Sequence, residues 1–361
     1  MKKTFLNAFV ALVAIATLTT FTSCKDDEVK NDPIDVNVEN PRSIAYDDEN
    51  LYITCYFPRS VIRYDIEQQA ITGICNLGEF QPEGIAAVGG KLYIASGYIA
   101  DDNFNYSYDN KLYVVDIKNF KVVDSITVGL NPSRVKKLDN SHIVFNTLGD
   151  YYTDFGGTYI MNTNSKEISE LSVSLTNFDV YSGDIYGYAT TYNADYSTSD
   201  VFYKIDGNSH EATQILTDWS ANDGAYGINI NPNNGNIMVT TNGNYAAAGD
   251  CYVFTNNGTS RMNAVSLGYL PSKAVAVSGD DILVLNEGGW GYNNAGVSRV
   301  NVASGTAVAD YFASSNGRGL GDVAQDILVH DGKAYITVTF SNSIETMDIN
   351  TGASTRFATA Q

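Results

Sequence analysis

The side chains that usually perform catalysis or bind metals are sparse in this 361-residue chain. Its three histidines, His142, His210 and His330, occupy different points of the internal repeat described below, so they are not expected to share a metal ion. No Gly-x-Ser-x-Gly elbow and no Cys–His pair stands out. Pairs of carboxylates arise by chance among 41 acidic residues and indicate no activity. The sequence therefore predicts a protein that is not an enzyme and needs no cofactor.

One segment partly matches a calcium-binding loop, in which oxygen-bearing side chains alternate along the chain. The matching residues are Asp101, Asn103, Asn105, Ser107 and Asp109. Tyr106 stands where such loops have a central glycine, and Leu112 stands where they have a glutamate. We therefore interpret the segment as a polar loop, with a calcium site as the alternative.

Tyrosines are concentrated in five polar segments, residues 96–110, 147–157, 190–200, 241–250 and 287–296. These segments hold nine of the 25 tyrosines in 57 residues, about three times the density elsewhere. A tyrosine ring offers contact area at little entropic cost, so the mixture with Asn, Gly and Ser favours ligand binding, with ordinary solvated loops as the alternative. The candidate ligand-binding residues in these segments are Tyr98, Tyr106, Tyr108, Tyr151, Tyr152, Tyr192, Tyr196, Tyr245, Trp290 and Tyr292.

A repeat of about 40–50 residues must position these segments. Its clearest copies open at Pro41, Pro82, Pro132 and Pro271, and diverged copies open near Phe178, Ile228 and Ile327. Each copy contains four β-rich runs separated by Gly, Asn and Asp turns, and no segment keeps a helical apolar period. We therefore expect an all-β fold, a seven-bladed β-propeller of four-stranded blades, over residues 41–361. Either residues 34–38 or residues 355–358 would supply the strand that completes the ring.

The expected strand order places two sets of connections on the same face of the ring. One set joins the second and third strands, and the other joins consecutive blades. The five tyrosine-rich segments belong to blades two to six, whereas blades one and seven have short connections. We therefore expect a wall over five blades with a gap between blades seven and one. Tyr52, Tyr93 and Tyr335 lie within predicted strands and are interpreted as structural.

A ring of polar residues should line the mouth of the central channel. Its members precede the first strand of each blade: Arg42, Glu83, Arg134, Asn177, Tyr226, Lys273 and Asp326. Among them we select Arg134, Asn177, Tyr226 and Lys273 as ligand-binding candidates. Mixed charges and amides suit a polar, amide-bearing ligand, and a solvated channel is the alternative.

The first 23 residues have the features of a secretory signal peptide, because basic residues are followed by an apolar stretch that ends at small residues. The residues directly before Cys24 resemble the lipobox of bacterial lipoproteins, which implies that Cys24 is acylated and begins the mature chain. Residues 24–40 are expected to form an acidic linker. Within it, residues 25–28 resemble an export signal to the cell surface of the outer membrane. A lipid anchor requires no transmembrane helix.

The overall charge excludes one class of partner. The formal net charge is −19, and loss of the two signal-peptide lysines makes it −21. Such a surface repels phosphate backbones, so nucleic-acid binding is not expected. Apart from Cys24 the chain has only Cys55, Cys75 and Cys251, an odd number that argues against a disulfide scaffold.

Residues 112–135 resemble the YVTN-type repeat of YncE-like propellers, from Leu-Tyr-Val-Val-Asp-Ile to Val-Gly-Leu-Asn-Pro-Ser-Arg-Val. Together with Cys24 and the acidic residues after it, this repeat resembles the surface lipoprotein propellers of Bacteroides-type bacteria, and in particular the BtuG-type family that binds vitamin B12. The resemblance covers nearly the whole chain. It implies capture of a corrinoid and its transfer to a TonB-dependent outer-membrane transporter. The residues themselves indicate only the type of surface, so a glycan- or protein-binding lipoprotein without catalytic activity is the alternative.

Overall fold

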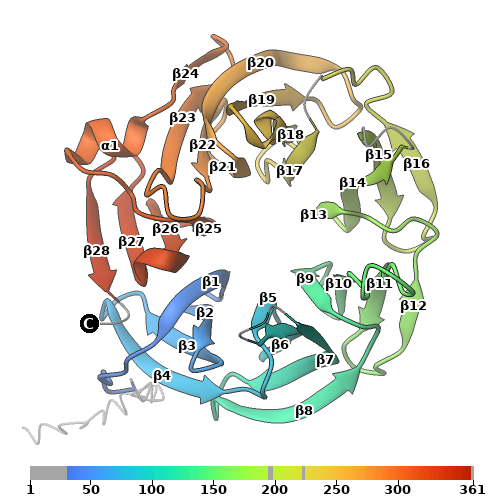
Figure 1. Ribbon diagram of the computed structural model, residues 1–361, viewed down its shortest axis with the longest axis vertical. Coiled ribbons are helices and arrows are strands. Elements are labelled where there is room, and N and C mark those ends of the chain that lie inside the picture. Colours follow the sequence, from blue (N-terminus) through green and yellow to red (C-terminus); the bar gives the residue numbers. More distant parts are fainter. Residues whose placement is uncertain (1–30, 102, 104, 194–197, 222–223, 359–361) are drawn as a thin grey trace, which may run out of the picture. The chain divides into compact units, whose positions relative to one another are not determined.

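The computed structural model describes residues 31–101, 103, 105–193, 198–221 and 224–358. Contacts between residues divide the chain into a unit that ends at Asp32 and a unit from Pro33 to Gln361. The second unit is a seven-bladed β-propeller, in which seven four-stranded antiparallel sheets form a ring (Figure 1). This confirms the fold class expected from the repeat. Among the described residues, no helix has the length and apolar character needed to cross a membrane.

Each blade takes four consecutive strands, ordered from the channel outward. Blades 1 to 4 contain β1 (Glu39–Tyr46), β2 (Asn50–Phe57), β3 (Ser60–Asp65) and β4 (Ala70–Asn76); β5 (Pro82–Val88), β6 (Lys91–Ala100), β7 (Tyr106–Asp116) and β8 (Lys121–Thr127); β9 (Pro132–Lys137), β10 (His142–Thr147), β11 (Gly157–Asn162) and β12 (Ile168–Glu170); and β13 (Asn177–Tyr181), β14 (Asp184–Tyr192), β15 (Thr198–Asp206) and β16 (Ala212–Ile215). Blades 5 to 7 contain β17 (Ala225–Ile230), β18 (Ile237–Thr241), β19 (Ala248–Phe254) and β20 (Ser260–Tyr269); β21 (Pro271–Ser278), β22 (Asp281–Asn286), β23 (Gly296–Asn301) and β24 (Thr306–Val308); and β25 (Ala324–His330), β26 (Lys333–Val338), β27 (Ser343–Asp348) and β28 (Ser354–Ala358).

The hydrophobic core lies between the blades. In the described residues, seven clusters of buried side chains each join two neighbouring sheets, including a cluster that joins blade 7 to blade 1. Successive residues of a strand point to opposite faces, so Tyr52 packs toward blade 2 while the adjacent Ile53 packs toward blade 7. Both side chains are fully buried. Second strands are therefore apolar on both faces, which explains the continuous β-rich runs of the sequence.

The C-terminal strand completes blade 7. β28 pairs with β27, and residues 34–38 form no strand. These upstream residues nevertheless pack on the ring, since the Ile34 N–H donates to the Ile71 carbonyl at 2.8 Å and Val38 is fully buried. The contacts of the propeller thus begin upstream of residue 41.

Side chains on the inner strands tie consecutive blades together around the channel. The carboxylate of Asp326 in blade 7 accepts the N–H of Ile44 in blade 1 at 2.8 Å. Asp179 in blade 4 accepts the N–H of Ile230 at 3.0 Å, and Asn229 accepts the N–H of Ala274 at 2.8 Å. These bonds hold the inner strands in register, and they position the residues that line the channel.

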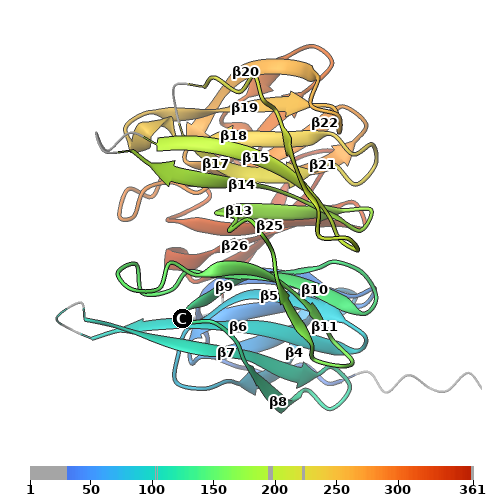
Figure 2. The same cartoon turned by 90° about the vertical axis from the view of Figure 1, so that its right-hand side faces the viewer.

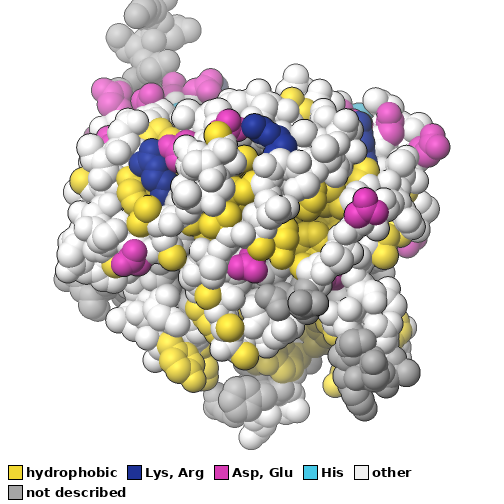
Figure 3. All heavy atoms as spheres, turned by 90° about the horizontal axis from the view of Figure 1, so that it is seen from above, with side chains coloured by type: hydrophobic (Ala, Val, Ile, Leu, Met, Phe, Trp, Pro, Cys, Tyr) yellow, Lys and Arg dark blue, Asp and Glu magenta, His cyan; other side chains and the backbone are white. Residues whose placement is uncertain are grey.

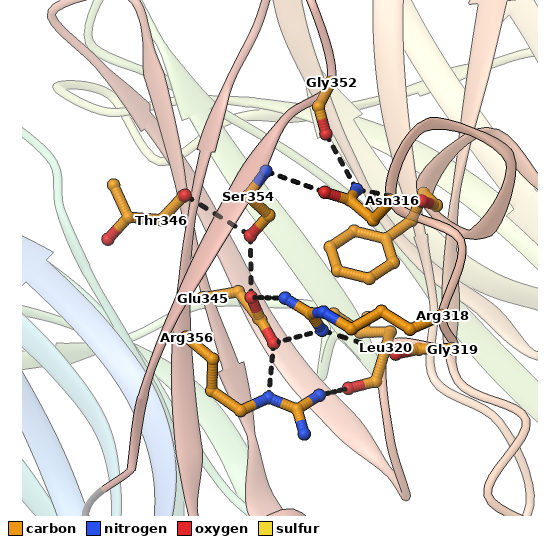
Figure 4. A network of polar contacts seen from close by, with 10 residues as sticks. Asn316, Arg318, Gly319, Leu320, Glu345, Thr346, Gly352, Ser354 and Arg356 are labelled. Atoms are coloured by element: carbon orange, nitrogen blue, oxygen red, sulfur yellow. Dashed lines mark hydrogen bonds and ion pairs between the residues drawn. The ribbon is translucent and has the colours of Figure 1, made fainter.

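A short α-helix, α1 (Tyr311–Asn316), lies between blades 6 and 7 in the sequence. The chain after it carries Arg318, whose guanidinium forms two hydrogen bonds of 2.8 Å with the carboxylate of Glu345 on β27 (Figure 4). Arg356 and Ser354 on β28 donate to the same carboxylate, each at 2.6 Å. Glu345 is fully buried. This network therefore ties the last two strands of the ring to the connection that enters blade 7.

Candidate functional site

The connections between the second and third strands of blades 2 to 6 project from one side of the ring, at the left in Figure 2. The sequence suggested that the five tyrosine-rich segments are loops. In two of them the described residues instead extend strands. β6 and β7 pair as far as Ala100 with Tyr106, and β14 and β15 pair as far as Tyr192 with Thr198. Cross-strand pairing satisfies the backbone polar groups that an irregular loop would leave to water. These hairpins are therefore more rigid supports for side chains than loops would be.

Five of the predicted tyrosines surround one pocket of about 440 Å³. They are Tyr98, Tyr106, Tyr108, Tyr151 and Tyr152. The rings form a chain of contacts, with centroids 5.6 Å apart for Tyr98 and Tyr106, 6.4 Å for Tyr106 and Tyr108, and 6.5 Å for Tyr108 and Tyr151. The planes of Tyr106 and Tyr108, two residues apart on one face of β7, differ by only 11°. Blades 2 and 3 thus present a continuous aromatic surface.

An ion pair between Arg42 and Glu83 forms part of the pocket lining. Arg42 donates from Nε to Glu83 at 2.7 Å, and the Tyr56 hydroxyl donates to the other carboxylate oxygen at 2.6 Å. The Arg42 guanidinium also lies over the Tyr56 ring, 5.0 Å from its centroid. Among the described residues, the two terminal nitrogens of Arg42 have no hydrogen-bond partner, although Arg42 lines the pocket. Hence the pocket offers fixed N–H donors beside the aromatic rings, and their charge is balanced by Glu83.

Burial keeps the hydroxyl of Tyr98 in the pocket, and that of the neighbouring buried Tyr56, protonated. It raises the pKa of Tyr56 and of Tyr98, and the carboxylate of Glu83 raises both further. At neutral pH these groups therefore donate and accept hydrogen bonds rather than act as nucleophiles. Asn131 and Ser133 complete the polar lining, and sequence reasoning named neither of them as a ligand contact. It also did not name Tyr56, which is buried and holds the Glu83 carboxylate. Their position beside the pocket depends on how blades 1, 2 and 3 pack.

The turn that carries Tyr151 and Tyr152 is tightly organised. The Asp150 carboxylate accepts the N–H groups of Tyr152, Thr153 and Asp154 at 2.9, 2.7 and 2.9 Å, which lowers its pKa. Tyr151 has a φ of 64°, a left-handed conformation that bulky residues seldom adopt. Such conformations cost about 1 kcal/mol or more and persist where the surrounding structure imposes them. Tyr151 is therefore held in place at the edge of the pocket.

A second aromatic pair lies on blade 5 and is hydrogen-bonded to blade 6. Tyr226 and Tyr245 meet edge to face with ring centroids 6.1 Å apart. The Tyr226 hydroxyl donates to Glu287 at 2.6 Å, and burial together with this carboxylate raises the pKa of Tyr226. Tyr245 also has a left-handed φ, 57°. Tyr226 was predicted to line the channel mouth, and in the structure its ring also contacts Tyr245 of a tyrosine-rich segment.

Four predicted mouth residues, Arg134, Asn177, Lys273 and Asp326, line a channel cavity of about 670 Å³. Lys273 pairs with Asp326, and Lys136 pairs with Asp179 at 3.3 Å. Burial lowers the pKa of Lys273, which Asp326 opposes and the nearby Lys136 reinforces. Ion-paired lysines therefore line the channel together with Arg134 and the Asn177 amide.

The remaining predicted residues stand apart from the tyrosine pocket. Trp290 is 76% exposed and contacts Phe340 of blade 7, with ring centroids 6.3 Å apart. Phe340 was not anticipated from the sequence, because it lies in the short connection of its blade. Tyr192 and Tyr292 are 79% and 78% exposed. Tyr196 and Cys24 lie outside the described residues.

The residues of the calcium-like segment have other partners in the structure. Asp101 accepts the N–H groups of Asn103 and Asn105 at 2.8 and 2.9 Å, and Asp109 accepts the Ser96 hydroxyl at 2.6 Å. In the described part of the chain, no group of three or more His, Cys, Asp or Glu residues is arranged to hold a metal ion. Cys55, Cys75 and Cys251 are free and buried, in agreement with the expectation that the chain is not a disulfide scaffold.

Comparisons with known proteins show the fold. No family model matches the chain, and no curated protein sequence matches it. Among solved structures, a Kuenenia stuttgartiensis hydrazine synthase chain is similar over 90% of this chain and 99% of its own, at 15% identity and a TM-score of 0.64. The computationally designed Ika8 protein is similar over 91% and 90%, at 7% identity and 0.58. The Cps50 (Swd1) β-propeller domain of Myceliophteria thermophila is similar over 90% and 98%, at 10% identity and 0.56. The chain has a propeller fold.

Proposed function

We propose that this protein captures a ligand on its tyrosine-rich face without altering it chemically, and that the ligand is a corrinoid such as vitamin B12. The observation that carries the proposal is the pocket between blades 2 and 3, where five tyrosines surround Arg42 N–H donors that have no partner within the described residues. Aromatic lining with a few oriented polar groups is the composition of small-molecule sites. The propeller fold itself is compatible with a binding role.

The balance of charge in the pocket supports a neutral, amide-bearing ligand. Glu83 neutralises Arg42, so the guanidinium offers hydrogen bonds without net attraction for an anion. Amide carbonyls are matched acceptors for these N–H groups. A corrinoid carries several amides around a broad, partly apolar ring system, which could rest on Tyr106 and Tyr108 while an amide reaches Arg42. The pocket would hold one edge of such a ligand, and the channel mouth would lie under the rest.

The same proposal includes the cellular context. A lipid on Cys24 would anchor the protein in the outer membrane at the cell surface, and a TonB-dependent transporter would receive the ligand. The support is the resemblance of the N-terminus and of the repeat to surface lipoprotein propellers.

One observation favours the alternative, a partner that is itself a protein. Tyr152, Tyr192, Trp290 and Tyr292 expose 76–85% of their surface around the face. Tyrosine and tryptophan are enriched at the energetic centres of protein interfaces. These outer aromatics would serve a transporter or another protein, whereas the pocket would serve the small molecule.

Calorimetry with cyanocobalamin tests the proposal. The wild-type protein should bind, and Tyr108→Ala should weaken binding by about thirtyfold, the loss of about 2 kcal/mol expected for a central aromatic contact. The matched control is Phe155→Ala, because Phe155 is 74% exposed in the β10–β11 connection but does not line the pocket. Absence of binding by the wild type would refute the corrinoid. Equal binding by Tyr108→Ala and the control would refute the site.

A further inference from the structure

A third hollow lies away from the tyrosine-rich face, on the outer edge of the ring between blades 4 and 5. Its volume is about 640 Å³. The connection from β16 to β17 forms one side, β19 forms the floor, and the turn into β20 forms the other side. Figure 3 views the edge of the ring that lies uppermost in Figure 1 and shows hydrophobic side chains gathered in a hollow of that edge. The sequence did not single out any residue of this region.

The centre of the hollow is an indole held by other aromatic rings. Trp219 lies 5.0 Å from Phe202, 5.1 Å from Tyr252 and 6.3 Å from Phe254, measured between ring centroids. Its backbone N–H donates to the Leu216 carbonyl at 2.9 Å. The indole is only partly buried, and it lines the hollow. Trp219 is therefore an oriented aromatic platform that remains in contact with solvent.

Polar groups around this platform have hydrogen-bonding capacity to spare. In the described part of the chain, the Trp219 indole N–H, the Asp218 carboxylate and the amide nitrogen of Asn263 have no partner. The Asn257 carbonyl oxygen is used by Thr259, whose N–H lies 3.3 Å from it, but the Asn257 amide nitrogen is also without a partner there. The hollow thus combines one aromatic ring, three N–H donors and one acidic acceptor.

We infer that this hollow is a binding site for a short neutral oligosaccharide. The C–H groups on one face of a sugar ring carry partial positive charge, and they stack on the negative face of an aromatic ring. Sugar hydroxyls both donate and accept, so they match the amide and indole donors together with the Asp218 acceptor. The volume is within the range of small-molecule pockets. The site is independent of the corrinoid proposal, since it shares no residue with the tyrosine pocket.

Other ligand classes fit less well. An apolar ligand would desolvate the unpartnered polar groups and leave them without hydrogen bonds, which is unfavourable. An acidic sugar or a phosphate would meet Asp218 and the strongly negative protein, whose formal charge is −19. A neutral sugar avoids both costs.

Intrinsic fluorescence can read this site alone, because the chain has only two tryptophans, Trp219 and Trp290. In a Trp290→Phe protein, tryptophan emission reports Trp219. We would titrate this protein with cellotriose, maltotriose, xylotriose and mannotriose up to about 20 mM, the range that detects weak millimolar affinity. At least one sugar should shift or quench the emission in a saturable way. If none of them does, the inference is overturned.

Variants then locate the bound sugar. Asp218→Ala and Asn263→Ala should each weaken binding at least fivefold at an unchanged melting temperature, as expected for loss of a hydrogen-bond partner. The matched control is Asn208→Ala, an exposed asparagine outside the hollow, which should bind normally. A Tyr151→Ala/Tyr152→Ala protein should also bind sugar normally. If that protein loses sugar binding while Asp218→Ala keeps it, the sugar sits on the tyrosine-rich face and the edge site is refuted.

Discussion

The buried carboxylate of Glu345 gives the sharpest test of what holds blade 7 in the ring. Replacement by glutamine keeps the shape of the side chain and removes its charge, so no cavity contributes to the result. Four hydrogen bonds to the carboxylate are affected, two from Arg318, one from Arg356 and one from Ser354. The glutamine amide can accept through one oxygen only, and its NH2 group faces donors.

The expected loss of stability follows from the exposure of the partners. Breaking a buried ion pair costs about 3–5 kcal/mol when the remaining charge stays buried. Here Glu345 is fully buried, but the side chains of Arg318 and Arg356 are 35% and 39% exposed, so water can solvate them after the change. We therefore expect the lower end, about 3 kcal/mol. An unfolding entropy of about 2.1 cal/mol/K per residue over roughly 330 residues converts this to a melting temperature about 4 °C lower.

The dependence on pH gives this prediction a second readout. Burial by itself would raise the pKa of Glu345, but Arg318, Ser354 and Arg356 together lower it. A carboxylate whose pKa is lowered in the folded protein stabilises it above the unfolded pKa of about 4.3 and ceases to do so as pH falls through the lowered value. Wild type and Glu345→Gln should therefore differ most at neutral pH and converge below about pH 4.

Thermal unfolding by calorimetry at several pH values measures both effects. Glu170→Gln serves as the matched control, because Glu170 is exposed on the outer strand β12 and has no ion pair within the described residues. Its melting temperature should change by less than about 1 °C. A drop that small for Glu345→Gln at neutral pH, or a drop that persists undiminished into acid, would show that the network does not stabilise the ring electrostatically.

Three further predictions concern the aromatic residues and the anchor. Tyr335→Ala should destabilise the protein by about 3–5 kcal/mol because Tyr335 is 1% exposed, whereas Tyr152→Ala, at 85% exposure, should change stability by less than about 0.5 kcal/mol; thermal unfolding compares them. Tyr151→Gly should weaken ligand binding but change stability by less than about 1 kcal/mol, because relief of the left-handed conformation at φ 64° offsets the lost contact with Tyr108 and the backbone entropy of glycine; a larger loss of stability would contradict the account of its turn. Cys24→Ala should abolish membrane association, and protease treatment of intact cells should then no longer remove the protein. Unchanged fractionation would refute the lipid anchor.

Individual strands and connections show which parts of the fold are predictable from the sequence. The β-rich run at Tyr52 and Ile53 predicted a strand, and the structure shows that each of these residues contacts a different neighbouring blade. The tyrosine-rich segments were correctly placed between second and third strands. Their conformation was not, since pairing between β6 and β7 continues to Ala100 and Tyr106, where polar residues had suggested a loop.

The grouping of the candidate site required the folded ring. Arg42 and Glu83 are 41 positions apart, and their ion pair exists because the first strands of blades 1 and 2 lie side by side. Tyr108 meets Tyr151 across a blade boundary, whereas Trp290 turns toward Phe340 instead. Nothing in the spacing of these residues distinguishes the aromatics that meet from those that do not.

The sequence by itself determined the repeated four-stranded blade, because alternation of apolar residues and the turn preferences of Gly, Asn and Asp are local properties of the chain. Only the tertiary structure decided which side chains face a pocket, which carboxylate is buried, and that a hollow opens beside Trp219. Those features depend on the packing of one blade against the next. Contacts between residues far apart in sequence set that packing, so no local pattern records it.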